Sequence, residues 1–150
     1  MTDDRKRTPG AFLFPEERKV VEDAIGRAEA GTTGEVRVMT SSRAGEDIMA
    51  EAQKRFAKLG MDRTEHKNGV LIMLALKSRS YAIVGDEAIH AVIGQEGWDG
   101  LRDGMARCFR EGRFGDGLSF AVSEVGRFLK EHFPSSGVNP NELPDEVVEE

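Results

Sequence analysis

The order of apolar and polar positions along the chain predicts alternating helices and strands. Apolar residues recur at helical spacing over residues 20–28, behind a helix start at Pro15 that has acidic residues in its first turn. Apolar and polar positions then alternate in EVRVMTSS, which predicts a strand over residues 35–41. A second helical pattern covers residues 48–59. The first half of the chain therefore indicates helix, strand and helix.

The most apolar segment, VLIMLAL over residues 70–76, has no polar position. Such a run is expected of a strand that is covered on both faces, so we expect it to be the central strand of the sheet. A polar break over residues 77–80 and a short apolar run up to Val84 follow. This pattern predicts strands near residues 69–77 and 80–85 that form an antiparallel hairpin.

The period changes back to helical after Gly85. We expect a short helix over residues 88–93, a longer one from Trp98 to Phe109, and a last one that ends before Pro134. A helical crossover joins the first two strands, which makes them parallel. The fold class is therefore α/β: a helix-flanked α/β/α sandwich with a small mixed sheet, a parallel pair plus an antiparallel hairpin strand.

The chain divides into one domain and two terminal segments. Residues 1–11 are charged and predict a flexible leader, and residues 12–134 predict a single α/β domain. Residues 135–150 combine Pro, Gly, Asn and acids without periodicity, which predicts a disordered acidic tail. We expect removal of everything after Pro134 to leave the stability of the domain almost unchanged.

Composition narrows the classes of function. The 27 acidic and 21 basic residues give a formal charge of -6, which disfavours nucleic acid or anionic lipid as a partner. No stretch has the apolar character of a secretory signal or the roughly 20 apolar residues of a membrane span, so we expect a cytoplasmic protein without direct membrane insertion. The single cysteine, Cys108, suits a core position better than a nucleophile.

The strand directions bring three distant segments to one edge of the sheet. Residues 33–35 and 66–69 precede the parallel strands, and residues 85–87 end the antiparallel one. Asn68, Asp86 and Glu87 would there offer hard oxygen ligands to calcium or, less favourably, to magnesium. The alternative is structural: Asp86 caps the next helix with Glu87 in its first turn, and Asn68 belongs to a turn. Both interpretations stay open.

Other polar residues carry weaker signals. Glu46 and Asp47 suit a helix start, with a second metal site as the minority interpretation. His66 and His90 lack the spacing of a transition-metal site, and Arg79 suits a polar hairpin as well as a phosphate contact. No nucleophile motif or organic-cofactor motif is present, so the catalytic residues are unknown and hydrolysis would depend on a metal and carboxylates.

Several short motifs occur together in a fixed order. They are Thr33-Gly34-Glu35-Val36-Arg37-Val38, the strand entry Asn68-Gly69-Val70-Leu71-Ile72, Arg79, Gly85-Asp86, and Phe109 with the glycine turn that follows it. With these motifs the chain resembles the TPM-domain family over roughly residues 14–133. The resemblance implies a helix-flanked α/β sandwich, calcium binding at one sheet edge, weak acid phosphatase activity, and roles in envelope or stress maintenance. We expect a metal-binding module with a protein partner, and the alternative is a weak metal-dependent acid phosphatase.

Overall fold

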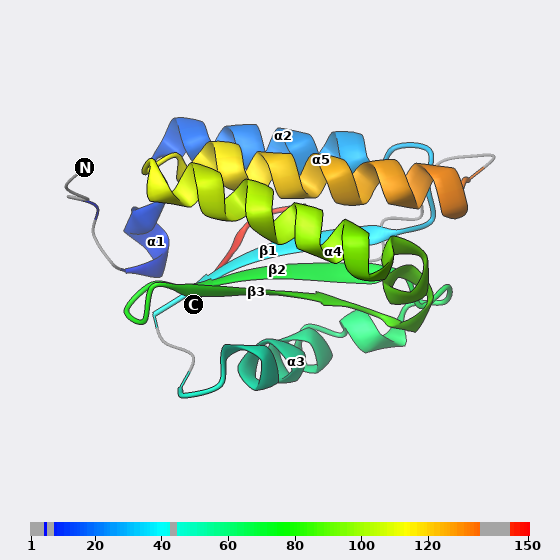
Figure 1. The fold of residues 1–150 in the computed structure, drawn as a ribbon, viewed down its shortest axis with the longest axis horizontal. Helices are drawn as coiled ribbons and strands as arrows, with labels where there is room; N and C mark the ends of the chain where they lie inside the picture. Colours follow the sequence, from blue (N-terminus) through cyan, green and yellow to red (C-terminus); the bar gives the residue numbers. More distant parts are fainter. Residues whose placement is uncertain (1–4, 6–7, 43–44, 136–144) are drawn as a thin grey trace.

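The computed structural model describes residues 5, 8–42, 45–135 and 145–150. Its elements follow the predicted order of helix, strand, helix, hairpin and helices (Figure 1). In chain order they are α1 (Pro9–Phe12), α2 (Pro15–Glu29), β1 (Glu35–Ser41), α3 (Ile48–Lys58), the 3-10 turn η1 (Met61–Arg63), β2 (Gly69–Ala75), β3 (Ser80–Gly85), α4 (Glu87–Arg110), α5 (Phe114–His132) and β4 (Val148–Glu149).

The sheet is mixed, and its strand order is β3-β2-β1-β4. β1 and β2 are parallel, with Glu35 opposite Gly69, whereas β2 and β3 are antiparallel, with Val70 opposite Gly85. β2 lies between two neighbours and all seven of its residues are buried. The predicted strands and the central position of the apolar run are confirmed.

Helices cover both faces of the sheet, which explains why β2 has no polar position. α2, α4 and α5 lie on one face and α3 lies on the other (Figure 1). Val70, Ile72 and Leu74 of β2 belong to the core on the first face, while Leu71 and Met73 belong to the core beneath α3. Successive side chains of a strand alternate between faces, so each face of β2 needs its own apolar set.

The two helices expected after β3 are one interrupted helix, α4. Gly94 has φ 68° and ψ 173° within it, a conformation in which only glycine is free of strain. The expected division between residues 88–93 and the segment from Trp98 is therefore present as a break at Gly94. α5 follows after a turn at Gly112, whose φ is 75°.

The prediction of a disordered tail is wrong for residues 145–150. β4 pairs in parallel with β1, with Val148 opposite Met39, and the preceding Val147 is only 7% exposed. Arg18 of α2 also contacts Glu149 at 2.6 Å. These residues pack because β1 offers them an unpaired edge, which local composition does not reveal. Residues 136–144 lie outside the described part of the chain.

The prediction of a flexible leader is wrong for Arg5 and for residues 8–11. The short helix α1 begins at Pro9, and the Arg5 side chain forms an ion pair with Glu17 of α2. Residues 1–4 and 6–7 lie outside the described part of the chain. The packed unit thus extends beyond the expected bounds of 12–134 on both sides. No helix in the described segments combines the length and apolarity needed to cross a membrane.

Candidate functional site

Three segments converge at the sheet edge formed by the starts of β1 and β2 and the end of β3, as the sequence predicts. The backbone N–H of Asp86 donates to the carbonyl of Gly69 at 2.9 Å. The N–H of Ala88 donates to the carbonyl of Lys67 at 3.0 Å. Glu35 lies opposite Gly69 across the parallel pair. These backbone contacts hold the loop before β2 against the start of α4.

Asn68 is the buried centre of this edge. Its side chain is fully buried, and its Nδ2 donates to the hydroxyl of Thr33 at 2.9 Å. Thr33 is fixed in turn by its N–H, which donates to the carbonyl of Phe133 at 3.0 Å. The Oδ1 of Asn68 is buried and accepts no hydrogen bond from the described residues. An amide oxygen left without a donor is costly unless a ligand or water supplies the interaction.

Asp86 lies beside Asn68 as the N-cap of α4. Its Oδ1 accepts from the N–H of Glu87 at 2.8 Å, so the capping interpretation of Asp86 is present in the structure. Its Oδ2 is buried and has no partner among the described residues. The side chain of Glu87 is exposed. Capping uses one carboxylate oxygen of Asp86 and leaves the other for a further interaction.

Gly85 lets the start of α4 close over this edge. A Cβ at Gly85 would lie 2.9 Å from a ring carbon of Trp98, which is shorter than a normal contact. The exposed side chain of His90 also lies here, and its ring centroid is 5.6 Å from that of Trp98. The glycine before Asp86 is thus required by close packing of α4 on β3.

The other candidate residues lie outside this cluster. Asp47 caps α3 by accepting from Ala50 N–H at 3.1 Å, and both Glu46 and Asp47 are exposed. Arg79 is exposed in the turn between β2 and β3. His66 is exposed beside Glu65. Within the described residues, no group of three or more His, Cys, Asp and Glu side chains is placed to hold a metal ion.

A buried acidic residue near the start of β1 has no counterpart in the sequence predictions. Glu29, at the end of α2, is 4% exposed, and its Oε2 accepts from Val36 N–H at 2.9 Å. Burial raises the pKa of Glu29 to about 10, and a hydrogen bond to Asp145 contributes to the rise. The signal that could have found Glu29 is its spacing, because it continues the buried i, i+4 series of Val21 and Ile25.

Comparison with known proteins places the chain in one family. The TPM domain profile matches residues 8–128. The BA42 protein from the psychrophilic bacterium Bizionia argentinensis has a similar structure, with a TM-score of 0.84 and 35% identity over 91% of this chain and 94% of that chain. No curated protein matches this chain.

Two more distant structures share the fold. The N-terminal domain of a P. gingivalis protein has a TM-score of 0.62 at 19% identity, over 83% of each chain. The N-terminal domain of the cg2496 protein from Corynebacterium glutamicum has a TM-score of 0.64 at 16% identity, over 87% of this chain and 83% of that one. At this identity the likeness concerns architecture alone.

Proposed function

Because this chain belongs to the TPM-domain family, we propose that it is a non-catalytic module that binds a divalent cation weakly at the edge formed by Asn68 and Asp86. The cation is calcium in preference to magnesium. A protein partner binds the module and distinguishes its calcium-bound form from its calcium-free form. One observation carries the proposal: two buried oxygens, Oδ1 of Asn68 and Oδ2 of Asp86, lack hydrogen-bond partners among the described residues of the same edge.

The chemistry of these donors fits a calcium ion. Amide and carboxylate oxygens are hard ligands, and Glu87 supplies a further exposed carboxylate within one residue of Asp86. Calcium takes six to eight oxygens in flexible geometry, whereas magnesium demands a near-ideal octahedron. Three side chains, from the loop before β2 and the start of α4, would leave much of the shell to water and backbone carbonyls. Such a site favours calcium and binds it weakly.

Weak acid phosphatase activity is the alternative function. A bound cation would polarise a phosphoryl oxygen, and the chain would have to place a nucleophile or water beside it. Asp86 Oδ1 is engaged at the helix cap, so its carboxylate is partly committed to structure. The proposal of a binding module therefore ranks first, and turnover of a phosphomonoester separates the two functions.

Thermal melts with calcium and with a chelator test the proposal. If the dissociation constant is about 0.1 mM, 1 mM calcium adds about 1.4 kcal/mol to the free energy of unfolding and raises Tm by about 3–5 °C. Asp86→Asn should remove this shift, since an amide still caps α4 but lacks the charge that calcium needs. Asp47→Asn at the cap of α3 is the matched control and should keep the shift.

Four outcomes contradict parts of the proposal. No shift in the unaltered protein at fixed ionic strength removes cation binding at this edge. An equal shift in Asp86→Asn moves the site elsewhere, and loss of the shift in Asp47→Asn assigns it to the end near α3. Calcium-dependent turnover of p-nitrophenyl phosphate that Asp86→Asn abolishes would establish the phosphatase instead.

A further inference from the structure

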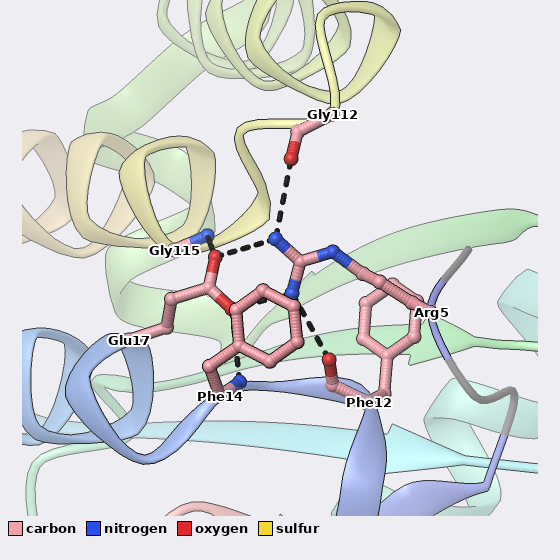
Figure 2. A network of polar contacts seen from close by, with 6 residues as sticks. All are labelled: Arg5, Phe12, Phe14, Glu17, Gly112 and Gly115. Carbon is pink, nitrogen blue, oxygen red and sulfur yellow. Dashed lines mark hydrogen bonds and ion pairs between the residues drawn. The ribbon is translucent and has the colours of Figure 1, made fainter. Parts of the chain in front are cut away.

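The guanidinium of Arg5 is held in a cleft between α2 and the turn that joins α4 to α5 (Figure 2). Its two terminal nitrogens form a bidentate pair with Glu17, with Nη2 at 2.8 Å from Oε2. Nη1 also donates to the carbonyl of Phe12 at 3.0 Å, and Nη2 to the carbonyl of Gly112 at 3.3 Å. The Arg5 side chain is only 11% exposed.

Three aromatic rings surround the same guanidinium. Its central carbon lies 4.2 Å from the ring centroid of Phe14, 5.0 Å from that of Phe114 and 5.5 Å from that of Phe12. A planar cation against ring faces gains a cation–π attraction, and arginine gains more than lysine because its plane also stacks. The cleft thus matches both the shape and the charge of an arginine side chain.

The carboxylate of Glu17 is oriented by contacts that do not involve Arg5. It accepts from the N–H of Phe14 at 2.9 Å and from the N–H of Gly115 at 3.3 Å. Burial alone would raise the pKa of Glu17, but the hydrogen bonds from Arg5, Phe14 and Gly115 together with the Arg5 charge lower it. The acceptor is therefore an ionised group whose position is set by α2 and α5.

Gly115 permits this close approach of α5 to α2. A Cβ at Gly115 would lie 3.0 Å from Cβ of Glu17. The carbonyl of Gly112, in the preceding turn, faces the same guanidinium. The acceptors in the cleft thus come from α1, α2 and the turn before α5, whereas the cation comes from Arg5, ahead of α1.

A cavity of about 370 Å³ adjoins the bound guanidinium. Its lining includes the exposed apolar side chains of Phe14 and Val20 and the acidic residues Glu16, Glu17 and Asp116. Arg113 also lines the cavity and pairs with Asp116 at 3.0 Å, so Glu16 and Glu17 are the acids of the lining that face a bound cation. The space has room for residues next to an arginine, and its acidic lining favours a basic segment.

We infer that this cleft is an arginine-recognition site, which the chain fills with its own Arg5 and which binds an arginine-bearing peptide segment of a partner protein when Arg5 leaves. The site lies at the opposite end of the sheet from Asn68 and Asp86 (Figure 1). Its ligand is a cationic peptide and its acceptors differ from those proposed for calcium. The calcium proposal and the arginine-recognition proposal can therefore be tested independently.

The full chain with Arg5→Ala provides the test, because its cleft retains every acceptor. The probes are the octapeptide of residues 2–9, TDDRKRTP, the same peptide with Lys in place of both arginines, and N-acetylarginine amide. Amide NMR shifts report binding, and we expect changes at Phe14, Gly112 and Gly115. The octapeptide should bind with a dissociation constant on the order of 1 mM, and the unaltered chain should bind it about fivefold more weakly because its tethered Arg5 competes.

Variants of Glu17 and of an acid outside the cleft identify the site. Adding Glu17→Gln to Arg5→Ala should weaken the octapeptide about tenfold, since a neutral amide loses the charge-assisted bidentate pair. Adding Glu131→Gln, at an exposed acid near the end of α5 that does not line the cavity, is the matched control and should leave the affinity within about twofold. Arg5→Lys is a second host if Arg5→Ala does not fold, and the arginine peptide should displace its lysine.

The inference is overturned if the octapeptide causes no shift in a folded Arg5→Ala or Arg5→Lys chain, which would make Arg5 a structural contact only. It is also overturned if Glu17→Gln leaves the affinity unchanged, or if the lysine peptide binds equally well. Equal affinity for N-acetylarginine amide and the octapeptide would replace the partner segment by a small guanidinium compound.

Discussion

The carboxyl groups of Glu29 and Asp145 share a hydrogen bond between the end of α2 and the segment that precedes β4. One of the two must carry a proton for this contact to form, and the raised pKa of Glu29 assigns the proton to it. The buried side chains of Glu35 and Arg37 interact with the Glu29 carboxyl, and Glu146 adds a further negative charge near Arg37. The contact therefore couples the docking of the C-terminal segment to a buried proton.

Replacing Glu29 by Gln should flatten the pH dependence of stability. The pKa of Glu29 rises from 4.5 to about 10 on folding, so the folded state holds more protons and stability falls as pH rises through this window. The slope due to this group is at most about 1.4 kcal/mol per pH unit. An amide is neutral, accepts from Val36 and donates to Asp145, so Glu29→Gln should be the more stable protein at pH 8.

Urea denaturation at pH 5.5, 7 and 8.5 measures this difference, with the exposed Glu16→Gln as the control. If the free energy of unfolding depends on pH in the same way in the unaltered protein and in Glu29→Gln, Glu29 is ionised in the folded state.

Truncation after residue 144 should destabilise the domain by about 1–3 kcal/mol. It removes the burial of Val147 and the backbone hydrogen bonds between Glu150 and both Thr40 and Ser42. Val147→Ala alone should cost about 1 kcal/mol. Chemical denaturation of the full and shortened chains gives the values, and a change below about 0.5 kcal/mol would show that this segment does not dock in solution.

The pair of Arg5 and Glu17 should show a coupling of about 1–2 kcal/mol in a double-mutant cycle of Arg5→Ala and Glu17→Gln. Both side chains are mostly buried, so the coupling should exceed that of exposed pairs. The pKa of Glu17 is lowered from 4.5 on folding, so this contribution is present above pH 4.5 and is lost as pH falls through the folded pKa. Urea denaturation at pH 7 and pH 3 tests both statements, and an additive cycle at pH 7 contradicts them.

Thr33→Val should cost about 1–3 kcal/mol, because it leaves the buried Nδ2 of Asn68 without an acceptor. It should also weaken the calcium-dependent shift in Tm, since the orientation of Asn68 depends on this contact. Thr8→Val is the matched control, because Thr8 is exposed just before α1. A neutral Thr33→Val would show that Asn68 finds another partner.

Local patterns predicted most of the architecture. The two-residue period over 35–41 and the apolar run over 70–76 located β1 and β2, although the period alone implies one exposed face and all seven residues of β1 are buried. The strand directions then brought Asn68 and Asp86 to the same end of the sheet. The break at Gly94 was also visible as a change between two helical segments.

Those local patterns do not predict contacts between residues that lie far apart in the sequence. Arg5 lies in a polar leader, and its burial depends on a carboxylate twelve residues away and on a turn near residue 112. β4 has two residues, and its pairing depends on the free edge of β1 rather than on its own sequence. Whether Asp86 only caps α4 or also binds a cation depends on the unpartnered Oδ2, which no spacing rule reports.

The outer edge of β1 is closed by two different means. β4 pairs with it at Met39 and Thr40. Nearer the start of β1, the Glu29 carboxyl accepts a hydrogen bond from the N–H of Val36. Exposed strand edges are templates on which a second molecule adds its own strand, and this is a common start of aggregation. Loss of residues 145–150 would therefore open the end of β1 to intermolecular pairing, and the shortened chain should self-associate as its concentration rises even where it remains folded.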